Sequence, residues 1–284
     1  MKRSVGKTFS KFAALAALVP FSGPAFADRP LPWQISMQDP VTPVAEKLQD
    51  LHYLLLWIIT LTVIFVMGLL GYVCWRFRAK ANPIPSRTSH NTVIEVLWTV
   101  LPVLILLVIA VPSFKLLYFQ ETVPKSELTL KVTGLQWYWH YAYPDNGDFG
   151  FDSVVLDDKD LKDPSLRLLD VDNEVVVPVN TNIRVQIAGS DVMHSWFVPS
   201  LAVQKYAVPG RLNEVWMNID KEGTYFGECN QICGVNHAFM PIKVHVVSKE
   251  AFAQWVAQAK SKYAREDGLA PSARLASAET PARQ

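Results

Sequence analysis

One stretch of the chain gathers side chains that bind soft metal ions. Residues 227–241 read G-E-C-N-Q-I-C-G-V-N-H-A-F-M-P, and a further imidazole lies upstream in D-V-M-H-S-W. The candidate ligands are His194, Cys229, Cys233, His237 and Met240. Such sulfur and nitrogen donors suit copper better than magnesium or calcium. A mononuclear blue-copper site needs two His, one Cys and a weak Met, so the additional thiolate is most simply used if both sulfurs bridge two copper ions.

Two simpler interpretations of the cysteine pair stay open. In an oxidising compartment, two nearby cysteines can form a disulfide. A C-x3-C pair with two histidines can also hold zinc, although the usual zinc spacings differ. Neither interpretation accounts for Met240 or for the Trp-rich segment 136–141.

The copper-type stretch resembles subunit II of haem–copper cytochrome c oxidase, of the bacterial aa3 type, which carries a dinuclear CuA centre. The resemblance extends to two hydrophobic spans and to G-L-Q-W-Y-W, D-V-M-H-S-W-F-V-P and A-V-P-G-R-L. It implies a cupredoxin fold that passes electrons from cytochrome c to haem in subunit I, where oxygen is reduced to water with proton pumping. The implied copper ligands are the five side chains above and the backbone carbonyl of Gln231.

Residue 231 departs from the family pattern. The family usually has Glu between the two cysteines, where the backbone carbonyl binds copper and the carboxylate helps bind magnesium at the boundary with subunit I. Gln231 can supply the same carbonyl. Magnesium prefers hard, charged oxygen ligands, and Gln offers only a neutral amide oxygen. We therefore expect intact copper binding and weak or absent magnesium binding through this residue.

The segment 136–141 (Q-W-Y-W-H-Y) concentrates aromatic residues. In a strand, Trp137 and Trp139 would point to one face, and Tyr138 and His140 to the other. One set can pack the core of the domain and the other the membrane interface, where Trp and Tyr are enriched. The resemblance implies a sharper role, in which Trp137 receives electrons from cytochrome c.

The charges are unevenly distributed, although the net charge is only +1. Of 27 basic and 26 acidic residues, residues 1–117 hold 11 and 5, which leaves 16 basic and 21 acidic for the rest. The acids concentrate between residues 145 and 174, as a solvated loop face or as a surface that steers a basic partner. The resemblance favours steering, and the matching docking positions are Asp152, Asp172 and Asp191.

Length and composition exclude several classes. A chain of 284 residues that is 50% hydrophobic can hold a membrane anchor and one exported domain, but it is not a polytopic transporter throughout. Its third cysteine, Cys74, lies in a hydrophobic span, so the chain is not a disulfide scaffold. It contains no C-x-x-C-H haem motif and no glycine-rich phosphate loop. No nucleic-acid partner is expected.

The N-terminal half is predicted to cross a bacterial inner membrane twice. Residues 1–27 combine basic residues, a short apolar core and an A-x-A site, as in a secretory signal peptide. A Pro-rich lead-in (28–50) precedes spans at 51–78 and 93–119. The loop 79–92 and its flank are basic, which marks the cytoplasmic side. The later domain and both mature termini are then periplasmic.

Glu95, near the cytoplasmic end of the second span, has two interpretations. The sequence T-V-I-E fits a capping box, with Thr92 as N-cap and Glu95 at N3. An acid at the membrane rim can also mark a proton path. Glu95 matches, by resemblance, the family's Glu at the mouth of a proton channel, and one residue can serve both roles.

Residues 120–247 have the short alternating segments of an all-β Greek-key sandwich or barrel. The candidate strands are 128–133, 136–143, 174–178, 183–188, 211–218, 223–226 and 242–247. Residues 248–263 have helical spacing, with Phe252, Trp255 and Val256 on one face. The composition of the tail, 264–284, is typical of disorder.

The sequence therefore predicts a cupredoxin-like domain on a two-helix transmembrane hairpin, working as the electron-accepting subunit of a respiratory oxidase. It would be an enzyme only within a complex that includes subunit I and other oxidase subunits. Two rivals are a structural quinol-oxidase subunit without copper and a copper chaperone or thiol–disulfide protein. The full ligand set argues against the first. The second needs neither a second His, nor this Met, nor paired spans.

Overall fold

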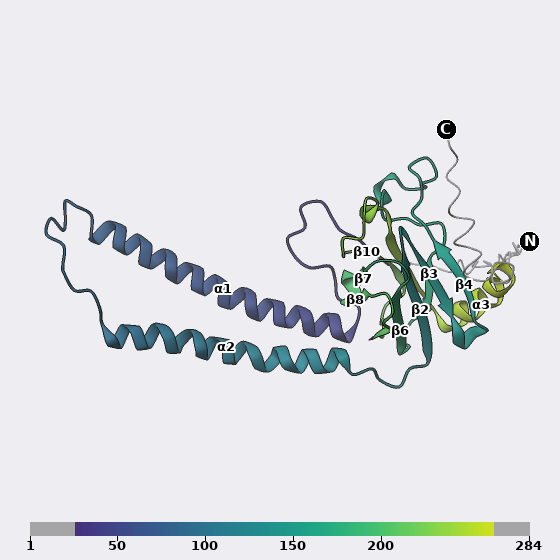
Figure 1. Cartoon of the computed structure of the whole chain (residues 1–284), viewed down its shortest axis with the longest axis horizontal. Coiled ribbons are helices and arrows are strands. Elements are labelled where there is room, and N and C mark those ends of the chain that lie inside the picture. The colour runs from purple at the N-terminus through teal and green to yellow at the C-terminus, as the bar shows by residue number, and fades with distance from the viewer. Residues whose placement is uncertain (1–25, 264–284) are drawn as a thin grey trace, which may run out of the picture.

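The computed structural model describes residues 26–263. Within them a long helical hairpin projects from a β-sandwich domain, and a shorter helix packs on the side of the domain away from the hairpin (Figure 1). Except for residues 26 and 27, the predicted signal peptide lies outside this range, as does the predicted tail, 264–284.

The hairpin consists of α1 (Pro43–Arg76) and α2 (Thr92–Glu121). Both helices are long and apolar enough to cross a membrane, and the apolar window of each is 0% buried within the chain. Helix α1 reaches back into the expected lead-in, because Thr42 caps it: the Thr42 hydroxyl accepts a hydrogen bond from the Ala45 amide at 3.0 Å. Pro43, whose fixed φ suits a first helical position, follows the cap.

The start of α2 corrects one prediction. The N-cap is Asn91 and not Thr92, because the Asn91 side chain accepts hydrogen bonds from the amides of Val93 (3.1 Å) and Ile94 (3.2 Å). Glu95 Oε1 accepts from the Asn91 amide at 3.2 Å. The reciprocal bonding of a capping box is kept but begins one residue earlier, since Asn is a stronger N-cap than Thr.

The β domain consists of two sheets, which confirms the predicted all-β sandwich on a two-helix anchor. The first sheet has the order β5 (Val175–Pro178), β11 (Pro241–Val247), β10 (Gly223–Cys229), β7 (His194–Val198) and β8 (Val203–Ala207), and β1 (Phe26–Asp28) also pairs with β10. The second has the order β4 (Phe149–Ser153), β3 (Tyr138–Tyr143), β2 (Leu128–Leu135), β6 (Ile183–Gly189) and β9 (Asn213–Met217).

The sequence pattern missed β1, β4, β7 and β8. The residues of β4 and β7 are buried almost without alternation, so they lack the period-2 signal of a half-exposed strand. Strand β4 pairs with β3, and β7 pairs with both β10 and β8. These pairings identify the segments as strands where the alternation of side chains does not.

Large aromatic side chains fill the space between the sheets. Along β3, Trp139, Tyr141 and Tyr143 are fully buried. The prediction that Trp137 shares their strand is wrong, because β3 begins at Tyr138 and Trp137 lies in the turn before it. This places Trp137 at the end of the sandwich and leaves it half-buried.

The C-terminal helix α3 (Lys249–Tyr263) closes the opposite end of the core. Its Trp255 ring lies 5.2 Å from the ring of Tyr143 and 5.8 Å from that of Phe149, measured between centroids. Val256 is buried and Phe252 is partly buried, which confirms the predicted apolar face.

Polar contacts join the hairpin to the β domain. Thr42 Oγ1 donates to the Leu201 carbonyl at 2.9 Å, and Trp216 Nε1 donates to the Phe119 carbonyl at 3.3 Å. Lys205 pairs with Glu121 at the end of α2, with an N–O distance of 2.9 Å. The domain is therefore held directly against the N-terminal end of α1 and the C-terminal end of α2.

Candidate metal centre

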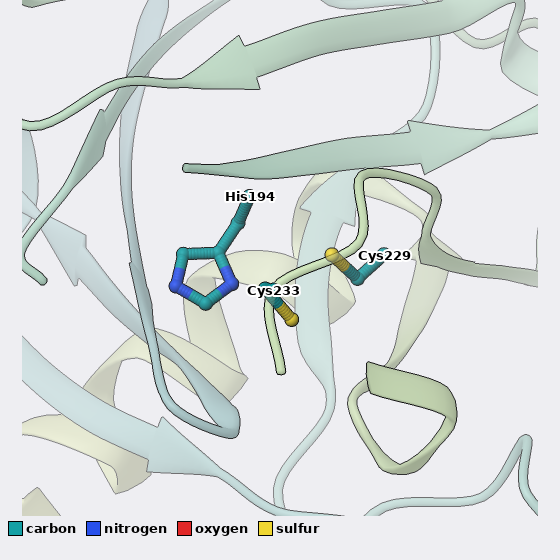
Figure 2. Close-up of side chains that lie close together, drawn as sticks. All are labelled: His194, Cys229 and Cys233. Atoms are coloured by element: carbon teal, nitrogen blue, oxygen red, sulfur yellow. The ribbon is translucent and has the colours of Figure 1, made fainter. Parts of the chain in front are cut away.

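Two neighbouring strands and the loop after one of them bring three candidate ligands together. His194 begins β7, Cys229 ends β10, and Cys233 lies in the following loop. The two strands pair, with Cys229 opposite Trp196. The ligand atoms of His194, Cys229 and Cys233 all lie within 4.8 Å of one another, and all three residues are buried. Figure 2 shows the His194 imidazole beside the two cysteine side chains.

The His194 ring is fixed by its surroundings. Its Nε2 lies 2.9 Å from Asp191 Oδ1, while its Nδ1 is buried and has no hydrogen-bond partner among the described residues. A Cβ on Gly134 would come within 2.8 Å of His194 Cδ2, so the ring packs directly on that backbone. An unpaired buried nitrogen is costly. Nδ1 is thus the atom left to bind a metal ion.

The other predicted ligands lie around the two sulfurs. Cys233 Sγ is 3.5 Å from Met240 Sδ and 3.6 Å from His237 Nδ1. Cys229 Sγ is 3.3 Å from the carbonyl oxygen of Gln231. All six predicted donor groups therefore gather in one place, and a set of thiolate, thioether, imidazole and carbonyl donors is compatible with copper. The described cysteines are free, so the disulfide interpretation is wrong for this structure.

Gln136 ties the cysteine loop to the turn between β2 and β3. Its backbone amide donates to Asp191 Oδ2 at 2.7 Å, and its side-chain Nε2 donates to the Cys233 carbonyl at 2.8 Å. Asp191 thus connects the His194 ring to Gln136, and Gln136 connects both to Cys233. Neither role was predicted from the sequence. The Asp-x-x-His spacing is a local signal for the first, but Gln136 and Cys233 lie 97 positions apart.

Trp137 lies beside the same loop. A Cβ on Gly234 would come within 2.9 Å of Trp137 Cζ2 and 3.1 Å of its Nε1. Gly234 also has a φ of +129°, which L side chains rarely adopt. The indole Nε1 is buried without a hydrogen-bond partner among the described residues. The indole therefore packs against the residue that follows Cys233.

The surroundings shift the pKa values of the two thiols in opposite directions. Burial raises the pKa of Cys229, but the His194 ring and the backbone groups of Ser195 and Gln231 outweigh it, and the net pKa is lowered. For Cys233, burial and the nearby Cys229 raise the pKa to about 12. Burial disfavours the charged form of His194, yet Cys229 and Asp191 favour it, so its pKa is raised. Because metal binding requires both thiolates, it releases protons here.

Of the remaining predicted site residues, Asp152, Asp172 and Glu95 lie apart from this cluster. Asp152 in β4 contacts His140 Nδ1 at 2.6 Å, and Asp172 accepts from the Val154 amide at 2.7 Å. Asp191 is the docking candidate that belongs to the cluster itself. Glu95 lies in the first turn of α2. That start of α2 is at the end of the hairpin remote from the β domain (Figure 1).

Comparisons with known proteins agree with this architecture. A family model described as cytochrome c oxidase subunit II, periplasmic domain, matches residues 128–247, and one described as the transmembrane domain matches residues 30–116. A probable cytochrome c oxidase subunit 2 of Rickettsia bellii is 52% identical over 250 residues, covering 88% of this chain and 93% of the relative.

Two further matches cover a smaller share of one of the two chains compared. Mitochondrial cytochrome c oxidase subunit 2 of Vigna unguiculata is 48% identical over 242 residues, covering 83% of this chain and 64% of that protein. The crystal structure of the periplasmic domain of subunit II of cytochrome oxidase (CoxB) of Bradyrhizobium japonicum is 53% identical and covers 50% of this chain and 99% of that one, with a TM-score of 0.47.

A β-sandwich with a buried His–Cys–Cys cluster, on two helices that are long and apolar enough to cross a membrane, is the architecture of a membrane-anchored protein with a candidate metal-binding domain. The family matches cover both parts of this architecture. The chain belongs to the cytochrome c oxidase subunit II family. It is therefore a subunit of a haem–copper oxidoreductase complex of the inner membrane, with its β domain in the periplasm.

Proposed function

We propose that this chain is the electron-accepting subunit of its oxidase. It binds a dinuclear CuA centre through His194, Cys229, Cys233, His237, Met240 and the Gln231 carbonyl. It takes electrons from cytochrome c and passes them to haem in subunit I, where oxygen is reduced to water with proton pumping. The observation that supports this proposal is the gathering of all six donor groups around two buried sulfurs.

The residues around the cluster suit electron transfer. A dinuclear copper centre, when bound, supplies one-electron chemistry whose charge is shared over two metal ions. Burial of His194, Cys229 and Cys233 excludes water, and the Asp191 bond fixes the imidazole. Gln136 holds the Cys233 backbone. A site held this firmly changes little in geometry between charge states, which favours fast transfer.

Copper analysis with electron paramagnetic resonance of the purified chain tests the central proposal. We expect two copper ions per chain that share one unpaired electron. One copper ion with a localised signal would mean a mononuclear site. Absence of copper, with both cysteines oxidised, would support a thiol–disulfide protein instead.

Trp137 is proposed as the residue through which electrons arrive. Its indole packs against Gly234, beside Cys233, and the neighbouring loop exposes Ile232 (80%) and Val235 (87%) as apolar contact surface. Aromatic side chains at such a surface suit a partner interface. Trp137→Phe should slow electron transfer from cytochrome c and leave the copper content unchanged. An unchanged transfer rate would move the electron-accepting point elsewhere.

Docking of cytochrome c is proposed to use Asp152, Asp172 and Asp191. The side chains of Asp152 and Asp191 are 41% and 34% exposed, and Asp172 is exposed. Changing Asp152 or Asp172 to Asn should lower the association rate chiefly at low ionic strength, because salt screens exposed charges. Asp191→Asn should in addition perturb the copper spectrum, since Asp191 holds His194.

Gln231 leads us to propose weak or absent magnesium at the boundary with subunit I. The residue presents its carbonyl to Cys229, and its side chain is a neutral amide. Gln231→Glu should raise the magnesium content of the complex without changing its copper content. Magnesium that resists chelation in the unaltered complex would contradict the proposal.

Glu95 is proposed to serve a proton path as well as the helix cap. Its carboxylate bonds only the Asn91 amide among the described residues, and it lies at the loop end of α2. Glu95→Ala should slow turnover of the assembled oxidase at unchanged copper content. Glu95→Gln, which keeps an acceptor for the cap, separates the two roles: normal turnover in that variant would remove the proton role.

The remaining topology is also a proposal: cleavage near Asp28, both mature termini in the periplasm, and the loop 79–92 in the cytoplasm. The basic flank of that loop supports it. N-terminal sequencing of the purified subunit and protease accessibility in spheroplasts test it. An uncut Met1, or a loop cleaved from the periplasmic side, would contradict it.

A further inference from the structure

A groove lies between the two hairpin helices at the end nearest the β domain. It has a volume of about 440 Å³. Helix α1 lines it with Lys47, Asp50, Leu51 and Leu54, and α2 with Pro112, Lys115, Leu116 and Phe119. On each helix these residues follow the i, i+3, i+4, i+7 spacing of a single face. The groove is therefore formed where the two faces meet.

The polar residues of the groove lie at headgroup depth. The uncharged run 54–75 of α1 is about 33 Å long at 1.5 Å per residue, which matches the hydrocarbon core of a bilayer. Asp50 and Lys47 then lie about 6 and about 10 Å beyond that core. On α2, Lys115 directly follows the uncharged run 96–114. Three charges from two helices thus meet at the periplasmic surface of the inner membrane. The apolar side chains of the groove lie next to them, toward the hydrocarbon core.

None of these three charges forms an ion pair within the part of the chain that the structure describes. The Lys47 ammonium lies 5.1 Å from the centre of the Phe119 ring, at the groove wall. Among residues 26–263, neither lysine nor Asp50 forms an ion pair, and Glu121, the acid near Lys115 on α2, is bound to Lys205. Two cations and one anion beside apolar side chains complement a headgroup that carries a phosphate and an ammonium.

We propose that this groove binds a phospholipid with an ethanolamine headgroup. Lys47 and Lys115 bind the phosphate, and Asp50 accepts hydrogen bonds from the ammonium. The upper part of an acyl chain lies along Leu51, Leu54 and Pro112. A choline headgroup cannot donate hydrogen bonds to Asp50, and a glycerol headgroup carries no cation for it, so the groove selects ethanolamine.

The test uses the assembled oxidase in nanodiscs of phosphatidylcholine doped with equal small amounts of phosphatidylethanolamine and phosphatidylglycerol. Lipids retained after extraction into mild detergent are counted by native mass spectrometry. The unaltered complex should retain phosphatidylethanolamine preferentially. Lys115→Gln should lower that retention about fivefold, as expected for one lysine–phosphate contact. Asp50→Asn should leave phospholipid bound but abolish the preference for ethanolamine.

Lys80→Gln, at the loop end of the hairpin, is the matched control and should change nothing. Copper content, measured in every variant, reports whether the β domain is intact. Equal retention of the three lipids by the unaltered complex would overturn the proposal, and so would unchanged retention in Lys115→Gln. A photoreactive side chain at Leu54 should crosslink to phospholipid. Crosslinking to another oxidase subunit would show that protein covers the groove.

Discussion

The β domain and the helical hairpin bury their side chains by opposite rules. In the β domain, Leu130 and Ile187 are 0% exposed, whereas in the hairpin Ile64 is 62% and Leu106 is 63% exposed. The domain buries its apolar side chains within one chain. The hairpin satisfies its backbone internally but leaves its apolar surface to lipid or to other subunits. The metal centre can therefore be specified by this chain alone, while the packing of the anchor is specified by its surroundings.

The largest expected difference between the two regions concerns their cysteines. Cys233→Ser should weaken copper binding more than about a hundredfold, since loss of a ligand exceeds the usual cost of losing a supporting contact. Cys74→Ser, in α1, should leave copper binding unchanged. Metal analysis and paramagnetic resonance measure both. Retention of two copper ions by the Cys233 variant would place the site elsewhere.

Glycines give the next largest contrast. A Cβ on Gly227 would lie 2.1 Å from the Phe197 carbonyl oxygen, so Gly227→Ala should destabilise the β domain by about 3 kcal/mol. Gly71 in α1 has nothing within 4 Å of an added Cβ, and Gly71→Ala should change stability by less than about 1 kcal/mol. Urea denaturation followed by tryptophan fluorescence compares them. Equal effects would mean that the hairpin is packed as tightly as the domain.

Two glutamines, one bonded to the cysteine loop and one remote from it, test whether the Gln136 hydrogen bond holds that loop in place. Gln136→Leu removes the donor to the Cys233 carbonyl, which should cost about 1–2 kcal/mol and weaken copper binding about tenfold. Gln49→Leu, in α1, should have neither effect, because no hydrogen bond of its side chain exists among the described residues. Competition with a copper chelator measures the affinity. Unchanged affinity in the Gln136 variant would show that the loop holds its shape unaided.

Acid should weaken the β domain through Glu174. Burial disfavours its charge, but His245 (2.9 Å) and Lys243 (3.1 Å) outweigh burial and hold its pKa below the ordinary 4.5. The stabilisation is therefore present above that ordinary value and is lost as the pH falls through the lower folded-state pKa. Glu174→Gln should flatten this acid dependence and cost about 1 kcal/mol at neutral pH. An identical acid profile in the variant would contradict this account.

The smallest effect is expected at the helix cap. Asn91→Ala should cost about 1 kcal/mol locally and speed hydrogen exchange of the Val93 and Ile94 amides, whereas Thr92→Ala should do much less. The β domain should not respond to either change. Faster exchange in the Thr92 variant instead would restore the cap position that the sequence pattern favoured.

The sequence alone predicted whatever depends on neighbouring positions. Cys229, Cys233, His237 and Met240 follow one another between the last residue of β10 and the start of β11, so their chemistry could be inferred before any fold was known. The two membrane-spanning helices and the apolar face of α3 follow from composition and periodicity. These features hold because a helix or a loop places nearby residues at nearly fixed distances.

Only the tertiary structure decided which distant residues support the site. Gln136 reaches Cys233 across 97 positions and Asp191 across 55, and Gly134 lies under the His194 ring. The same holds for Trp137, which the pattern placed in one strand with Trp139 and which the turn before β3 places beside Gly234. The number of positions between two residues does not give their distance in space when they lie in different strands or loops. Such contacts are set by sheet order and register, which arise only when the whole domain packs.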